Sequence, residues 1–428
     1  MARKMKDSGI EWIGEIPEGW EIKRLGAILQ ERNEVNNPIQ TTSILSLTNN
    51  RGVIPYSEKG NQGNKAKDDL TGYKIAHIGD IVLNSMNVII GSVGLSNYYG
   101  AVSPVYYMLF PRNNIETNIQ YYNYLFQTTA FQQSLRGYGN GILEIRMRIQ
   151  MQKLKTVLLP VPTFLEQSNI TVYLDASLSK LNILLSKIRS SIEEYKKLKQ
   201  AVITQAVTKG VRGEREMKDS GVGWIGAIPK DWEIKRLKSF CTIVDCKNRT
   251  PDVFPDGKYT VVRTTCIKDC SFSYEGSYQT DTTNFKAWTL KGQPHKGDIF
   301  FTREAPVGEA CLVPNADNLC MGQRVMFFRP EDNSDARYIM YSIYGPLVRE
   351  YIASKNSGST VGHLKLGQVA CIPIFYCPPL EQKEIADYLD AKCAEIAGLI
   401  AKKEQLVKEL ENYKKSLIYE VVTGKREV

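Results

Sequence analysis

The apolar residues between positions 163 and 209 follow a helical period. This stretch contains no glycine or proline, and its apolar residues recur at alternating spacings of four and three positions. Such an alternation predicts a long helix with a single apolar seam, as in a coiled coil. The predicted seam consists of Leu174, Leu178, Leu181, Leu185, Ile188 and Ile192.

A second stretch, at 380–428, repeats the first at an offset of 215 without a gap, so that Leu165-Glu166-Gln167 recurs as Leu380-Glu381-Gln382. Its seam consists of Leu389, Ile396, Ile400, Val407 and Leu410. One helix cannot bury such a seam alone, and we expect the two seams to bury each other. Two similar halves related by a pseudo-twofold axis would pair these helices antiparallel. An oligomerisation coiled coil and an ordinary core hairpin remain open as alternatives.

A shorter repeat lies ahead of each large block. Residues 5–25 and 217–237 are identical at 16 of 21 positions, at an offset of 212. A long, gap-free match near half the chain length indicates an internal duplication. Each copy carries two tryptophans, Trp12 and Trp20 in the first, and we interpret the copies as packing segments that dock on a domain edge. Stacking of these tryptophans on bases is the alternative.

Residues 26–160 and 238–378 contain short apolar runs separated by glycine, asparagine and proline, which predicts strand-rich domains with a few helices. One helix is expected at 121–133. The blocks share little sequence beyond scaffold markers, such as Tyr121 and Tyr124, which correspond to Tyr338 and Tyr341. We therefore expect one fold with two different surfaces.

The predicted fold class is mixed α+β with an internal pseudo-twofold repeat. Two tandem strand-rich domains, at 1–162 and 213–379, would be separated by two long helices, at 163–212 and 380–428, packed as an antiparallel coiled coil.

Composition indicates the general class of protein but does not point to a particular reaction. The hydrophobic share of 43% and the charged share of 24% are typical of a soluble globular protein. No apolar run is long enough for a membrane span. The net charge of +9 suits a polyanionic partner without proving one. Nine cysteines in mostly apolar surroundings indicate buried thiols in a reducing cytoplasm. Cys266 and Cys270 lack a histidine pair, so no metal site is predicted.

Motifs for catalysis are missing from the sequence. There is no phosphate-binding loop, and Asn36-Asn37-Pro38-Ile39 lacks the second proline and the aromatic residue of an adenine methyltransferase motif. Glu381-Gln382-Lys383 has the spacing of a nuclease motif but lies at a predicted helix start. The three histidines stand isolated. An enzyme is therefore not expected.

The chain resembles the specificity subunit of type I restriction–modification systems over essentially its whole length. The resemblance rests on the segment from Ser8 to Trp20 and its copy from Ser220 to Trp232. It rests also on Leu159-Pro160-Val161-Pro162 with Leu165-Glu166-Gln167, and on Pro378-Pro379-Leu380-Glu381-Gln382. The first copy departs from the pattern at Thr163-Phe164, where the second has two prolines.

The resemblance implies a non-catalytic subunit in which two target recognition domains each read one half of a bipartite site in double-stranded DNA. The long helices would be spacers that dock two modification subunits, which carry S-adenosylmethionine and methylate adenine. Restriction subunits, with ATP and magnesium, are further expected partners, and no cofactor is expected in this chain. A coiled-coil adaptor or a DNA-binding scaffold outside restriction–modification is the alternative.

Candidate DNA contacts follow only from side-chain chemistry, since arginine or lysine suits guanine, and asparagine or glutamine suits adenine. The basic, glycine-rich segment after residue 135 is the candidate reader in the first block, with a solvated loop as the plain alternative. The candidates are Arg136, Asn140, Arg146 and Arg148 in the first block, and Lys247, Asn248, Arg249, Arg303, Gln323, Arg324, Lys355, Asn356, Thr360 and His363 in the second.

Overall fold

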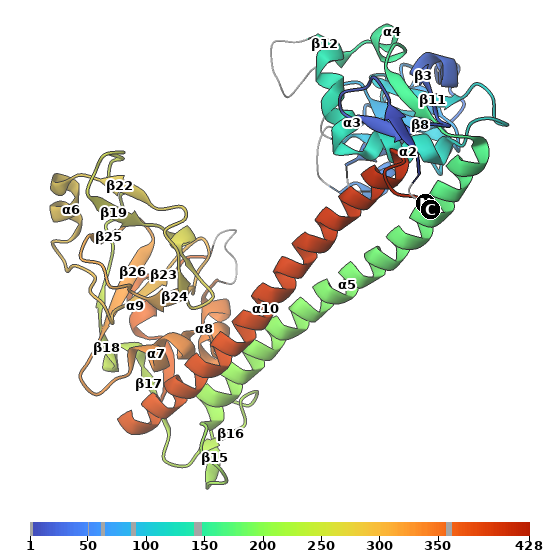
Figure 1. Ribbon diagram of the computed structural model, residues 1–428. Coiled ribbons are helices and arrows are strands. Elements are labelled where there is room, and N and C mark those ends of the chain that lie inside the picture. The colour runs from blue at the N-terminus through green and yellow to red at the C-terminus, as the bar shows by residue number, and fades with distance from the viewer. Residues whose placement is uncertain (1–2, 50, 61–64, 87–90, 141–147, 357–361) are drawn as a thin grey trace. The chain divides into compact units, whose positions relative to one another are not determined.

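The structure, a computed structural model, describes residues 3–49, 51–60, 65–86, 91–140, 148–356 and 362–428, with the backbone alone described at 139, 140 and 356. The chain forms two compact units. Unit 1 comprises residues 1–188 and 405–428, and unit 2 comprises residues 189–404. The two long helices of Figure 1, α5 (Phe164–Lys209) and α10 (Pro379–Val422), contribute to both units, so the division falls within the helices.

The main sheet of unit 1 has four antiparallel strands in the order β4-β11-β8-β9. They are β4 (Leu29–Arg32), β8 (Ile81–Asn84), β9 (Val93–Leu95) and β11 (Tyr106–Pro111). Successive side chains of a strand face opposite sides of the sheet. Ile81 and Leu83 accordingly lie in the larger core of the unit, whereas Val82 and Met108 lie in a smaller core on the other face.

Short antiparallel ladders complete unit 1, and they pair β1 with β2, β3 with β14, β5 with β6, β7 with β10, and β12 with β13. The strands are β1 (Met5–Asp7), β2 (Glu15–Pro17), β3 (Glu21–Arg24), β5 (Leu45–Thr48), β6 (Gly52–Pro55), β7 (Lys74–Ala76), β10 (Gly100–Val102), β12 (Gly139–Asn140), β13 (Arg148–Ile149) and β14 (Leu158–Val161). The short helices are α1 (Leu25–Ile28), α2 (Ile119–Gln127), α3 (Thr129–Ser134) and α4 (Met151–Leu154).

The single helix predicted at 121–133 is wrong, because the segment forms two helices, α2 and α3. Thr128 separates them in an extended conformation, and its hydroxyl accepts a hydrogen bond from the Phe131 amide at 3.3 Å. A threonine that caps the second helix in this way offers its backbone an alternative to helix continuation. The break directs both helices onto the larger core, where Tyr121 and Phe131 are fully buried.

Unit 2 repeats this architecture. Its main sheet has the order β18-β26-β23-β24, all antiparallel, from β18 (Cys241–Val244), β23 (Ile299–Thr302), β24 (Ala310–Leu312) and β26 (Val325–Pro330). Ile299 and Phe301 face the larger core, and Phe300 faces the smaller one. Unit 2 differs by a three-stranded sheet, β22-β19-β25, in which β19 and β25 are parallel.

The remaining strands of unit 2 are β15 (Met217–Asp219), β16 (Ala227–Pro229), β17 (Glu233–Arg236), β19 (Tyr259–Val262), β20 (Ile267–Lys268), β21 (Ser271–Phe272), β22 (Tyr278–Thr280), β25 (Leu319–Met321) and β27 (Pro373–Tyr376). Its short helices are α6 (Thr282–Trp288), α7 (Ala336–Ile343), α8 (Pro346–Asn356) and α9 (Leu366–Ala370).

The long helices pair within each unit. In unit 1, Leu174 and Leu178 of early α5 share a core with Leu417 and Val421 of late α10. In unit 2, late α5 shares a core with early α10, through residues that include Ile203 and Ile385. The start of each helix therefore packs beside the end of the other helix. This is the antiparallel pairing that the seams predict.

The predicted seam residues of both helices are all buried or half-buried. Two lysines at equivalent positions interrupt the seams and turn toward polar partners. Lys414 Nζ donates to Asn182 Oδ1 at 2.9 Å in unit 1, and Lys199 Nζ donates to the Asp269 carbonyl at 3.3 Å in unit 2. Within the described ranges, the chain has no helix that is both long enough and apolar enough to cross a membrane.

Candidate nucleic-acid interface

At one end of the main sheet, three loop segments meet in each unit, and the segments of unit 1 are equivalent to those of unit 2. We call this end of the sheet the loop edge. In unit 2 it comprises 302–304, 322–324 and 362–364. The Arg303 amide donates to the Arg324 carbonyl, and the Leu364 amide donates to the Arg303 carbonyl, both at 3.0 Å. These backbone bonds fix the places from which side chains extend beyond the sheet.

The loop edge of unit 1 has the same backbone arrangement. The Ile149 amide donates to the Ser85 carbonyl at 3.0 Å, and the Ser85 amide approaches the Val105 carbonyl at 3.4 Å. Ser85 therefore stands where unit 2 has Arg303, and Arg148 stands where unit 2 has His363. One scaffold thus presents different side chains at the same edge.

Arg303 is the central side chain of the loop edge of unit 2, although it is only 9% exposed. Its Nη1 donates to both carboxylate oxygens of Asp245, at 3.0 and 3.1 Å. Its Nη2 donates to Asn248 Oδ1 at 2.8 Å. A guanidinium that is paired and buried in this way holds the 245–250 loop against the sheet and leaves little of itself for a nucleic acid.

Glu304 holds two further candidates together. Its Oε1 lies 3.2 Å from Arg324 Nε, and its Oε2 lies 3.3 Å from His363 Nδ1. Arg324 has a backbone φ of +79°, in the left-handed region that is uncommon for residues with a side chain. Backbone strain of this kind is frequent at functional sites. The side chains of Arg324 and His363 both remain partly exposed beside the carboxylate.

The 245–250 loop is fixed at several points. Lys247 Nζ lies 4.8 Å from the ring centroid of Trp288, whose indole N–H donates to the Arg249 carbonyl at 3.1 Å. The Thr250 hydroxyl lies 3.4 Å from Gln323 Oε1. Lys247, Asn248, Arg249, Arg303, Gln323, Arg324 and His363, seven of the sequence candidates, therefore share one surface of unit 2.

The other candidates do not all fall on described residues. Lys355 lies on α8, with its Nζ 5.5 Å from the Tyr351 ring centroid. Asn356 ends α8, but its side chain lies outside the described residues, as does all of Thr360.

In unit 1, Arg136 is exposed in the 3₁₀ turn Leu135–Tyr138, and Arg148 is exposed in β13. Arg148 pairs with Asn140 in the β12–β13 ladder. The Asn140 side chain and all of Arg146 lie outside the described residues.

One tryptophan in each copy of the duplicated motif packs in the interior of its unit, whereas Trp224 of the second copy is 54% exposed. Trp20 and Trp232 are fully buried. Arg3 and Arg215 lie over their rings, at 5.6 and 5.9 Å from the centroids. The Trp20 indole N–H donates to Glu166 Oε1 at 3.2 Å. Buried rings are inaccessible to bases, so the packing interpretation of these two tryptophans is confirmed.

The Leu-Glu-Gln repeat at the start of each long helix ties that helix to its sheet domain. Glu166 forms an ion pair with Arg3, and Glu381 forms one with Arg215. Gln167 and Gln382 are fully buried. Their Oε1 atoms accept from the amides of the residues that cap α2 and α7, at 2.8 and 3.0 Å. Sequence reasoning missed this role, although the repetition of the three residues was a signal for it.

The nine cysteines are free thiols, and seven of them are buried while Cys270 and Cys371 are half-buried. Burial raises the pKa of the Cys241 thiol to about 12. Thiols with such pKa values are protonated and unreactive at neutral pH, which agrees with a packing role.

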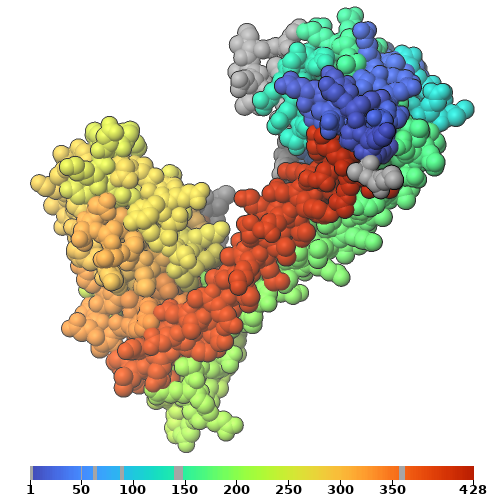
Figure 2. Space-filling view, in the orientation of Figure 1, coloured from blue at the N-terminus to red at the C-terminus, as the bar shows by residue number. Residues whose placement is uncertain are grey.

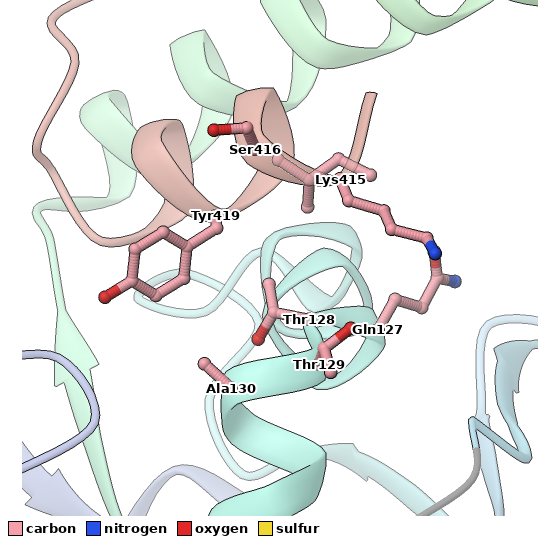
Figure 3. A pocket seen from close by; sticks show the side chains of 8 residues that line it. Gln127, Thr128, Thr129, Ala130, Lys415, Ser416 and Tyr419 are labelled. Atoms are coloured by element: carbon pink, nitrogen blue, oxygen red, sulfur yellow. The ribbon is translucent and has the colours of Figure 1, made fainter. Parts of the chain in front are cut away.

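A cavity of about 280 Å³ in unit 1 lies between the start of α3 and late α10. Gln127, Thr128, Lys415 and Tyr419 are among its lining residues (Figure 3). At the corresponding place in unit 2, Gln200 Nε2 of α5 donates directly to the Tyr344 carbonyl at 2.7 Å. The cavity therefore marks a gap in packing between repeated elements, and among the described residues that line it Lys415 is the one charged side chain.

Comparisons with known proteins give the family. The model of the type I restriction modification DNA specificity domain matches twice, at residues 17–194 and 229–409. The putative type I restriction enzyme MjaX specificity subunit of Methanocaldococcus jannaschii is 26% identical, over 96% of this chain and 95% of its own length. The MjaVIII specificity subunit of the same organism is 23% identical, over 96% of this chain and 93% of its own length.

Two solved structures share the fold. A chain from a study of complex assembly and conformational transition of the type I R-M system aligns with a TM-score of 0.71 at 15% identity, over 96% of this chain and 99% of that one. The HsdS subunit from Thermoanaerobacter tengcongensis aligns with a TM-score of 0.51 at 16% identity, over 96% and 98%. With its family model matched in tandem over most of its length, the chain belongs to the type I restriction–modification DNA specificity family.

Proposed function

We propose that this chain is the non-catalytic DNA-recognition subunit of a type I restriction–modification complex, and that each unit reads one half of a bipartite DNA site. The observation that carries the proposal is the loop edge. The same backbone arrangement places the exposed Arg148 of unit 1 where unit 2 has the exposed His363, and the buried Ser85 where unit 2 has the buried Arg303. A common scaffold with different side chains is what reading two unlike half-sites requires.

The chemistry of the loop edge supports DNA as the ligand. Lys247, Arg249 and Arg324 gather there with exposed amides of Asn248 and Gln323. Arginine, lysine, asparagine and glutamine supply most side-chain contacts to base edges in the major groove and to phosphates. Phosphate contacts would set the position of the DNA, and base contacts would set the sequence.

We further propose that the outer sides of the long helices dock two modification subunits. Each helix exposes a leucine in its first turn, Leu165 with 69% and Leu380 with 75% of its surface accessible. Much of the outer side of α10 is open to solvent in Figure 2. Exposed leucines at equivalent positions of a repeat favour the same kind of partner at both. S-adenosylmethionine, ATP and magnesium would then be bound by partner subunits.

DNA binding by the assembled complex tests the proposal. The chain, purified with its modification subunit, would be incubated with a random duplex library, and bound sequences would be recovered and read. The proposal predicts enrichment of one split motif, with affinity that falls steeply as salt rises because phosphate contacts release counterions. A coiled-coil adaptor without a nucleic-acid role predicts no enriched sequence.

A further inference from the structure

The amide of Asn248 at the loop edge of unit 2 is held in one orientation. Its Oδ1 accepts a hydrogen bond from Arg303 Nη2 at 2.8 Å. A guanidinium has donors only. The reversed amide would set its own donors against those of Arg303, so the oxygen must face the arginine and the NH₂ group must face away.

Arg303 is itself fixed. Asp245 accepts from its Nη1 with both oxygens, and the two groups are largely buried, with 11% and 20% of their side chains exposed. The Arg303 backbone is bonded on both sides, to Arg324 and to Leu364. The guanidinium therefore acts as a rigid donor beneath the 245–250 loop.

The NH₂ group of Asn248 is available to a ligand. The residue is exposed, and its Nδ2 atom donates to no acceptor in the described part of the chain. The loop on which it lies is anchored on the far side of Asn248 by the bond from the Trp288 indole to the Arg249 carbonyl. An exposed donor on an anchored loop is ready to bind without further ordering.

The orientation has a consequence for base choice. A free asparagine pairs with adenine by accepting from N6 and donating to N7. With its Oδ1 turned inward to Arg303, Asn248 presents only its NH₂ donors to a ligand. Guanine presents two acceptors in the major groove, N7 and O6, and thymine presents O4. Cytosine presents only an amine donor, and adenine presents its N7 acceptor beside an amine donor that would face the NH₂ group of Asn248.

We propose, on the basis of the function proposed above, that Arg303 is a positioning residue that orients Asn248. Asn248 then selects guanine or thymine at one position of the half-site that unit 2 reads. In this proposal Arg303 serves as a support for Asn248 and is not itself a reader, and Asn248 disfavours adenine. Unit 1 has no arginine at the place of Arg303. Ser85 occupies that place, and its hydroxyl donates to the Val105 carbonyl at 2.7 Å.

The test is the base preference of the complex with its modification subunits, measured by competition with duplexes that carry each base pair at each position of the unit 2 half-site. In Asn248→Asp, the inner oxygen still accepts from Arg303, but the outer atom becomes an acceptor. We expect the preference at one position to change by roughly tenfold, from guanine or thymine to cytosine or adenine.

A second variant tests the positioning role. Arg303→Met combined with Asp245→Asn removes the guanidinium without leaving an unpaired carboxylate, so the Asn248 amide can turn. We expect adenine to become accepted at the same position. A residue with a merely structural role would lower the affinity for all duplexes alike and would leave the order of the four bases unchanged.

Two matched controls separate these effects from charge and stability. Asn333→Asp adds the same charge on the loop after β26, at the other end of that strand from the loop edge. Arg329→Met with Asp298→Asn removes a comparable arginine–aspartate pair, at 2.7 Å, from the same sheet. Neither should alter the order of bases at any position.

The inference is overturned if Asn248→Asp keeps the base order of the parent, or if the parent prefers adenine or cytosine at the position that this variant alters. A parent complex that enriches no split sequence overturns the proposed function, and this inference with it. A parent that enriches one, with unaltered variants, overturns this inference alone.

Discussion

At the scale of single residues, the amino acids that are repeated in the two halves form interior contacts that hold each unit together. The amino acids that differ between the halves lie at the surface. Arg3, Trp20 and Glu166 form one contact group, and Arg215, Trp232 and Glu381 form its counterpart. The tryptophan rings of both groups are fully buried, so neither ring can stack on a base. The residues that distinguish the units lie instead at the loop edges, where no repeated sequence marks them.

The ionised Glu166 carboxylate should make the stability of unit 1 depend on acid. Burial alone would raise the pKa of Glu166, but hydrogen bonds from Trp20, Thr163 and Arg3 together lower it below its ordinary value. A folded-state pKa below the unfolded one gives stability that is present at neutral pH and is lost as the pH falls through the folded-state value. We expect Glu166→Gln to lower the free energy of unfolding by about 1 kcal/mol at neutral pH, and by less below about pH 4.

Urea unfolding of the full chain across this pH range measures the effect. Glu11 is exposed, and Glu11→Gln should leave the pH dependence as it is in the parent. A cost of Glu166→Gln that stays constant with pH would contradict the role given to the charge.

The sequence could predict buried repeats at this scale but not the pairing of side chains at the loop edge. Arg303 was a candidate because of its charge, yet its acceptor Asp245 lies 58 residues away and follows a different strand. Nothing periodic connects the two residues. Their contact depends on the order of strands in the sheet, which the pattern of short apolar runs does not specify.

At the scale of elements, the long helices were the most predictable part of the chain. Their seams repeat over many turns, so the period is unambiguous, and α5 and α10 cover nearly the stretches that the seams predict. The strands were less well defined, since each has only a few residues. The break between α2 and α3 escaped prediction because a single capping threonine decided it.

Burial along α5 gives a direct test of the seam. Leu178 lies in the core that α5 shares with α10, whereas Leu184 is 44% exposed on the same helix. We expect Leu178→Ala to cost about 2–5 kcal/mol of unfolding free energy, because it removes buried methyl groups and leaves a cavity. Leu184→Ala should cost less than about 0.5 kcal/mol.

Chemical unfolding of the two alanine variants, side by side, decides the point. Equal costs would mean that the helices do not pair through the predicted seam in solution.

At the scale of the whole molecule, the proposed complex depends on the exposed first turns of the helices. Leu165→Asp together with Leu380→Asp should abolish co-purification of the modification subunit. Aspartate is favourable in the first turn of a helix, where it complements the helix dipole, so the fold should be retained. Ile115→Asp, at a loop position that is 82% exposed, provides the control. Co-purification that survives the double substitution would place the docking surface elsewhere.

The most direct test of the central claim is sequencing of modified bases in DNA from cells that co-express this chain with its modification subunit. We expect methyladenine at one asymmetric motif with an unread gap. Replacing residues 238–378 by the equivalent block of a relative should change one half of the motif and preserve the other half. A continuous motif, or an exchange that alters both halves, would contradict two independent reading units on one repeated scaffold.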